Sequence, residues 1–198
     1  GVRRAAAGPA LARSLRSAGP GRPVEVMTLC LQPHHWYYVH GVRVHNKGCF
    51  VKTSEVTMAD GSRRQIQDLR PGDEVASWDE EARRSATSRV QEVPRFTREE
   101  EELVEVSLPS ATIHATEDHP FWSRSRGGLA SLHPNGTLSE YSLEASLLEA
   151  GEELEDERQQ AVPVAGLRRL GATASPERSL RSAEGAAAGG SRRPGEVM

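Results

Sequence analysis

Residues 1–27 recur, imperfectly, as residues 166–198, and this repeat strongly limits where a folded core can lie. Matching groups lie 165 residues apart near the start of the two stretches and 171 apart at their ends. Both stretches are rich in Ala, Gly, Arg, Ser and Pro and contain no aromatic residue, so neither buries much apolar surface. We predict a disordered arm over residues 1–21, a low-complexity repeat over 166–198 that is disordered from 171 to 195, and a folded domain between them.

The same repeat indicates a tandem array with a period of 165 to 171 residues, of which this chain is a segment. The chain starts with Gly-Val-Arg-Arg rather than Met, as expected for a piece of a longer protein. In the parent array, the residues after Met198 should resemble those from Thr28 onward.

Charge and cysteine content exclude several classes of protein. The chain has 25 basic and 28 acidic residues and a net charge of −3, so no overall field favours nucleic acid. No apolar run approaches the roughly 20 residues that span a bilayer. The two cysteines, Cys30 and Cys49, are too few for a disulfide framework or an all-cysteine zinc site, and leave either one bridge or two separate thiols. We expect the chain neither to bind nucleic acid nor to span a membrane. The sequence does not decide the cellular compartment, and a secreted parent protein is one of the alternatives.

Short apolar runs separated by turn residues fill the middle of the chain and predict an all-β domain. His40-Gly41 and Asp60-Gly61 have the composition of tight turns. A single short helix is expected over residues 143–150. Strands are expected at 24–31, 36–39, 42–45, 55–58, 74–78, 88–93, 103–108 and 111–115.

A second, fainter repeat predicts two related halves within this domain. Residues 69–75 and 148–154 share the spacing Leu, two residues, Gly, acid, one residue, aliphatic. Each copy fits a turn that leads into a strand, with Gly72 or Gly151 taking a backbone angle that other residues rarely adopt.

Cys49 is the first residue with candidate chemistry. It follows Gly48, which has no side chain to shield its carbonyl carbon, and the thiol can reach that carbon through a five-membered ring, turning the peptide bond into a thioester. A free thiol with a pKa of about 8.5 is mostly protonated at neutral pH, so a base must assist. Taken alone, Gly-Cys-Phe equally fits a buried, idle cysteine.

Two further motifs supply groups for such chemistry. Thr116 and His119, at the end of a predicted strand, can converge on one amide, where the imidazole donates a proton to the departing nitrogen and the hydroxyl hydrogen-bonds the strained peptide. The side-chain amide of Asn46 can attack its own backbone carbonyl and break the bond to Lys47, assisted by His45. Each motif taken alone also fits an ordinary turn.

Together, the three motifs resemble the Hint superfamily, the autoprocessing fold of hedgehog C-terminal domains, inteins and bacterial intein-like domains. Residues 48–75 resemble its opening block, 116–121 its Thr-x-x-His block, and 26–46 its closing blocks. The resemblance implies an all-β horseshoe with pseudo-two-fold halves and autocatalytic cleavage without a cofactor. It also implies five catalytic residues, which are Cys49, Thr116, His119, His45 and Asn46.

The order of the blocks is unusual, because the closing segment (22–46) precedes the opening and central part (49–165). The segment 24–46 can fold back onto residues 49–154 as a circular permutant, or pack on the preceding unit of the array. We predict closure within the chain, since permutation is tolerated where termini are adjacent.

Lys47 follows Asn46, where a splicing intein offers Cys, Ser or Thr, so the resemblance favours cleavage over ligation. The substrate is then the chain itself, in a single turnover, with water or a small nucleophile as thioester acceptor. The alternative is an inert structural or interaction repeat that keeps the Hint fold.

The histidines at 34, 35, 40 and 45 are not expected to bind zinc, because strand alternation separates them and no Cys or acid lies at ligand spacing. The resemblance assigns His35 to the closing block. Cys30, in an aliphatic strand, is expected to be a small buried hydrophobe.

Overall fold

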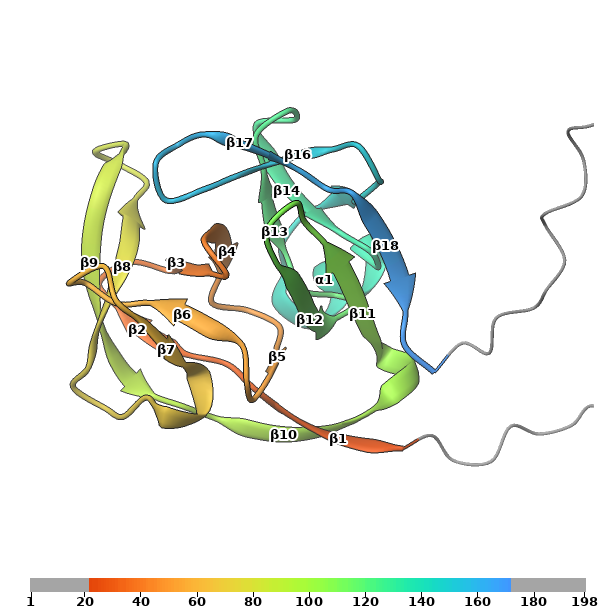
Figure 1. Cartoon of the computed structure of the whole chain (residues 1–198), viewed down its shortest axis with the longest axis horizontal. Helices are drawn as coiled ribbons and strands as arrows, with labels where there is room; N and C mark the ends of the chain where they lie inside the picture. Colours follow the sequence, from red (N-terminus) through yellow and green to blue (C-terminus); the bar gives the residue numbers. More distant parts are fainter. Residues whose placement is uncertain (1–21, 172–198) are drawn as a thin grey trace, which may run out of the picture.

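The computed structural model describes residues 22–171, which form an all-β domain with one short α-helix (Figure 1). This confirms the predicted fold class. Within this range, two single-turn 3-10 helices, Ile66–Asp68 and Glu100–Glu102, lie between strands. The strands are β1 (Pro23–Met27), β2 (Cys30–Gln32), β3 (Trp36–Val39), β4 (Val42–His45), β5 (Phe50–Val51), β6 (Glu55–Thr57), β7 (Arg63–Gln65), β8 (Glu74–Asp79), β9 (Arg84–Glu92), β10 (Arg95–Glu99), β11 (Leu103–Ser107), β12 (Thr112–Thr116), β13 (Phe121–Ser123), β14 (Gly128–Ser131), β15 (Ser146–Leu147), β16 (Glu153–Glu155), β17 (Ala161–Pro163) and β18 (Gly166–Arg169).

The strands form two sheets. A six-stranded sheet has the order β10-β1-β5-β12-β11-β18, and a larger sheet runs β15-β14-β13-β4-β3-β8-β9-β2, with β6, β7, β16 and β17 attached to it. Both sheets contribute to one core, in which Tyr37, Phe50 and Phe121 are fully buried. No helix in the described range is long and apolar enough to cross a membrane.

The hairpin of β3 and β4 lies at the centre of the larger sheet. Its two-residue turn has positive φ at both His40 (47°) and Gly41 (85°), the conformation that matches the twist of paired strands. The register pairs Trp36 with His45. On one side β3 pairs with β6 and β8, and on the other β4 pairs with β13.

The two related turns adopt the same structure, in agreement with pseudo-two-fold halves. Gly72 and Gly151 have φ of 96° and 88°. The Gly72 N–H donates to the Val90 carbonyl at 2.8 Å, and the Gly151 N–H donates to the Val164 carbonyl at the same distance. Each of these valines donates its own N–H back to the residue after the glycine, also at 2.8 Å. The central hairpin lies where the two halves meet.

The first strands close onto the rest of the same chain, as predicted. β1 pairs with β5 and β10, so that the orange strand β1 lies beside the green strand β10 in Figure 1. Together with the pairings of β3 and β4, these ladders join residues 24–46 to residues 49–154.

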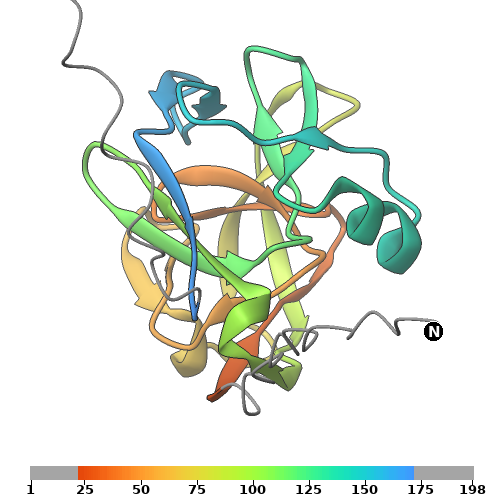
Figure 2. The same ribbon diagram turned by 90° about the vertical axis from the view of Figure 1, so that its right-hand side faces the viewer.

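The body of the domain extends into the predicted low-complexity repeat. Its first residues, Gly166–Arg169, form β18, which pairs with β11 and is seen as the blue strand beside the green one in Figure 2. Arg168 forms an ion pair with Glu105 at 2.7 Å, and Arg169 one with Glu117 at 2.6 Å. The predicted arm 1–21, and nearly all of 171–195, lie outside the described residues.

The predicted helix over 143–150 is wrong. The α-helix of the described range is α1 (Pro134–Tyr141), which begins with Pro134 and ends where Ser142 adopts a left-handed conformation with φ of 57°. Residues 143–150 form no helix, because Ser146–Leu147 pair with β14 and Leu148 is buried in the core.

Candidate functional site

The peptide nitrogen of Cys49 is held by Thr116. The Cys49 N–H donates to Oγ1 of Thr116 at 3.1 Å, and the Thr116 N–H donates to the Cys49 carbonyl at 2.9 Å. These contacts arise because β5 and β12 are neighbours, with Phe50 opposite Ala115. The Thr116 hydroxyl therefore lies directly against the Gly48–Cys49 bond. This is the bond at which the sequence predicts thioester formation.

Gly48, the other residue of this bond, packs against His119. Its φ is 77°, and a Cβ at this position would lie 2.6 Å from Nδ1 and 2.8 Å from Cα of His119. Both the backbone angle and the contact exclude a side chain. The glycine is thus required by a close approach to the imidazole, in addition to the open carbonyl inferred from the sequence.

His119 is fully buried between aromatic rings. Its ring centroid lies 4.1 Å from that of Phe50 and 5.1 Å from that of Phe121. Neither ring nitrogen has a hydrogen-bond partner within residues 22–171. Burial, and secondarily the nearby His45, holds the pKa of His119 well below its usual range. The imidazole is therefore neutral at pH 7, so it must accept a proton before it can donate one.

The Cys49 thiol, like the His119 imidazole, is uncharged at neutral pH. Burial raises its pKa to about 12, Asp118 adds to the increase, and Arg98 opposes it. The residue is 5% exposed and packs with Val26 and Leu103. The candidate nucleophile is therefore buried, because β1 and β11 cover it. Cys30 and Cys49 are both free thiols.

The side chain of Asn46 lies beside a histidine that the predicted catalytic set omits. Nδ2 of Asn46 is 3.4 Å from Nδ1 of His35, and the Asn46 N–H donates to the His35 carbonyl at 2.8 Å. The predicted hairpin was enough to place His35 beside Asn46. Its register pairs Trp36 with His45, so the residues just outside that pair, His35 and Asn46, lie next to each other.

His45 lies between the two groups of site residues. The His45 ring stacks on that of His35, with centroids 5.9 Å apart. The backbone N–H of His45 donates to the Pro120 carbonyl at 3.2 Å. Burial, followed by His35 and Lys47, lowers the pKa of His45 to about 4. This imidazole is also neutral at pH 7.

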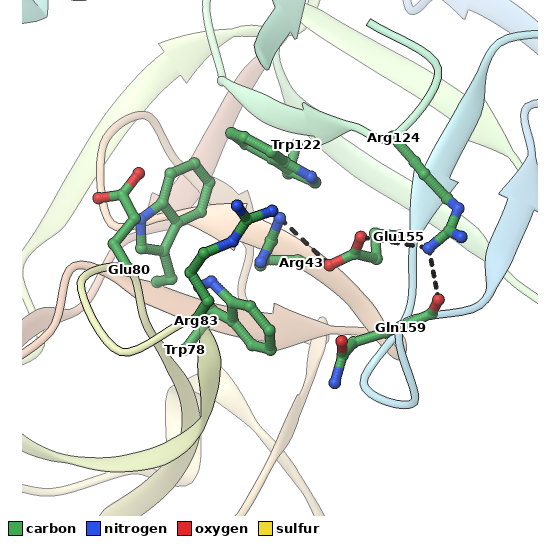
Figure 3. A pocket seen from close by; sticks show the side chains of 9 residues that line it. Arg43, Trp78, Glu80, Arg83, Trp122, Arg124, Glu155 and Gln159 are labelled. Atoms are coloured by element: carbon green, nitrogen blue, oxygen red, sulfur yellow. Dashed lines mark hydrogen bonds and ion pairs between the residues drawn. The ribbon is translucent and has the colours of Figure 1, made fainter. Parts of the chain in front are cut away.

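Trp36 packs against His45 and belongs to a cluster of three tryptophans around Arg43. The Trp36 ring meets the His45 ring edge-on, with centroids 5.0 Å apart. The buried guanidinium of Arg43 lies 4.7 Å from the ring centroid of Trp78 and 4.4 Å from that of Trp122, and it pairs with Glu155 at 3.1 Å (Figure 3). All three tryptophans line a pocket around Arg43 and Glu155, where the ion pair and the ring faces balance the buried charge.

The five predicted site residues thus gather where β4, β5 and β12 end or begin. Cys49, Thr116 and His119 surround one peptide bond, His45 lies near enough to lower the pKa of His119, and Asn46 lies beside His35. Across residues 22–171, no three His, Cys, Asp or Glu side chains are arranged to hold a metal ion.

Comparison with known proteins identifies the family. The Hint module matches residues 37–138, slightly more than half of the chain, and the matched range contains all five predicted site residues. The chain belongs to the Hint family. The Hint chain is also similar to the solution structure of a bacterial intein-like domain from Clostridium thermocellum, at 21% identity, with 69% of this chain and 77% of that one covered and a TM-score of 0.44. No match was found among curated proteins.

Proposed function

We propose that this Hint chain cleaves its own backbone, in a single turnover, on both sides of residues 47–48. Members of the family commonly process their own chain. The observation that carries the proposal is the environment of the Gly48–Cys49 bond, whose nitrogen is hydrogen-bonded to Thr116 and whose glycine contacts His119.

The first reaction is an N-to-S acyl shift at Cys49. Sγ attacks the carbonyl carbon of Gly48, a carbon–sulfur bond forms, and the bond to the Cys49 nitrogen breaks. Neutral His119 accepts the thiol proton and returns it to the departing nitrogen, so the step needs no other acid or base. A base is necessary because the pKa of the thiol is about 12. Water or a small nucleophile then releases the thioester.

The second reaction breaks the bond between Asn46 and Lys47. Nδ2 of Asn46 attacks the carbonyl carbon of its own residue, a succinimide forms, and the Lys47 nitrogen leaves as an amine. His35 lies within 3.4 Å of Nδ2 and accepts its proton, and His45 orients His35 through the ring stack. No metal or cofactor takes part in either reaction.

The test is incubation of the purified chain with dithiothreitol, followed by intact mass spectrometry. We expect a break before Cys49 in the wild-type chain and none in Cys49→Ala. A chain that remains whole while near-ultraviolet circular dichroism shows it folded would instead support an inert structural repeat that keeps the Hint fold.

A further inference from the structure

The two proposed cuts are separated by residues 47 and 48 alone, a spacing set by the reversed order of the blocks. We propose that the chain releases these two residues as a cyclic dipeptide, the diketopiperazine of lysine and glycine. This inference rests on the proposed function and specifies the nucleophile that takes the thioester.

The two cuts create the two reactive ends of one short segment. Cyclisation of Asn46 leaves Lys47 with a free α-amine, and the acyl shift leaves the Gly48 carbonyl carbon bound to Sγ of Cys49. Attack of the amine on that carbon closes a six-membered ring. The new bond joins the Lys47 nitrogen to the Gly48 carbon, the carbon–sulfur bond breaks, and the amine proton passes to the sulfur. Atoms and electrons balance without any co-reactant.

Tethering favours this acceptor over water. The amine and the thioester belong to the same dipeptide, so their effective concentration greatly exceeds that of an added small nucleophile. The ε-amine of Lys47 could also attack, but it would have to close a much larger ring. Gly48 has no side chain to crowd the carbon under attack.

The fold holds the flanking residues and leaves the dipeptide outside both sheets. Before it, β4 is paired with β3 and β13, and the Asn46 N–H is bonded to the His35 carbonyl. After it, β5 is paired with β1 and β12. Lys47 is exposed, and neither it nor Gly48 belongs to a strand. Once the Asn46 bond breaks, the thioester is the one covalent bond that retains the segment, and no ladder hydrogen bond opposes the cis peptide that ring closure needs.

The experiment incubates the full-length chain at neutral pH without added thiol and analyses small molecules by liquid chromatography and mass spectrometry. Synthetic cyclic and linear Lys-Gly serve as standards and differ by one water. We expect the cyclic product to exceed the linear one by about tenfold or more, because ring closure is intramolecular.

Two variants identify the origin of the product. Lys47→Ala alters the exposed residue between the cuts, so the product should become the cyclic dipeptide of alanine and glycine. Asn46→Ala keeps the thioester but supplies no free amine, so the cyclic product should disappear. A cyclic product that persists in Asn46→Ala would contradict the proposed route.

The outcomes separate this inference from the function on which it rests. Both cuts with linear Lys-Gly as the main product would overturn cyclisation and leave self-cleavage standing. A chain that shows neither cut would overturn both.

Discussion

The two bonds proposed for cleavage lie two residues apart in the chain and differ in almost every physical respect. The Gly48–Cys49 bond is buried, hydrogen-bonded to Thr116 and in contact with a neutral imidazole, but its nucleophile has a pKa raised to about 12. The Asn46–Lys47 bond ends in an exposed lysine, and its proposed nucleophile is a neutral amide that loses its proton only as it attacks. We therefore expect proton removal to limit cleavage of the downstream bond, and the orientation of Asn46 to limit cleavage of the upstream bond. On this proposal, one site carries two reactions that depend on different residues.

The largest expected effect separates the two bonds completely. Cys49→Ala removes the only thiol near Gly48, so the thiol-induced break before residue 49 should fall to zero while the cut after Asn46 persists. Truncating a buried cysteine costs about 1 kcal/mol, which leaves the chain folded. Intact mass spectrometry measures both cuts, and loss of the upstream cut would show that the two reactions are coupled.

The reciprocal change is Asn46→Ala. It removes the amide that forms the succinimide, so the cut before Lys47 should vanish and the thiol-induced break at Cys49 should continue at nearly its original rate. The fragments are resolved by mass over a time course. If both cuts stopped, the independence of the two reactions would be wrong.

His119 should affect the downstream bond much more than the upstream one. His119→Gln removes the base and should slow the break before Cys49 by roughly a hundredfold or more. Because His119 packs between Phe50 and Phe121, thermal unfolding of the variant is the control for its fold. An unchanged rate in a folded variant would exclude proton transfer by His119.

Substitution of His35 should slow the upstream cut much more than the downstream one. His35→Phe keeps an aromatic ring stacked on His45 but removes the nitrogen beside Asn46, so the upstream cut should slow by about tenfold and the downstream cut should be little changed. Equal slowing of both cuts would indicate a packing role instead.

The smallest expected effect is the dependence of stability on pH. The pKa of His45 is about 4 in the folded chain, against an ordinary value of 6.5, so the unfolded chain binds the proton first as pH falls. Stability from this group is fully present above pH 6.5 and is lost as pH falls through 4, by about 3 kcal/mol. Urea unfolding at pH 7 and 4.5 measures the loss, which should be smaller in His45→Gln. An identical loss in both chains would refute the assignment to His45.

Local patterns in the sequence were enough to predict much of the fold. The turn at His40-Gly41 specified the central hairpin, and through its register it also placed His35 beside Asn46. The helix was misplaced because Ser142 ends a helix that Pro134 begins earlier, and Leu148 is needed in the core.

The electrostatics of the site could not be predicted in the same way. The pKa values of Cys49, His45 and His119 are set by burial, which depends on strands distant in the sequence, such as β1 and β11 around the thiol. For the same reason, the sequence did not predict β18, which lies in the low-complexity repeat over residues 166–198. Its ion pairs join Arg168 and Arg169 to Glu105 and Glu117, more than fifty residues earlier.

The most direct test of the account is to trap the thioester at Gly48. The Asn46→Ala chain, which cannot be cut upstream, is incubated at neutral pH with hydroxylamine, and the products are weighed by mass spectrometry. We expect a fragment of residues 1–48 that ends in a hydroxamate, together with residues 49–198 starting at a free Cys49. A folded chain that stays whole under these conditions would contradict the formation of a thioester on Cys49.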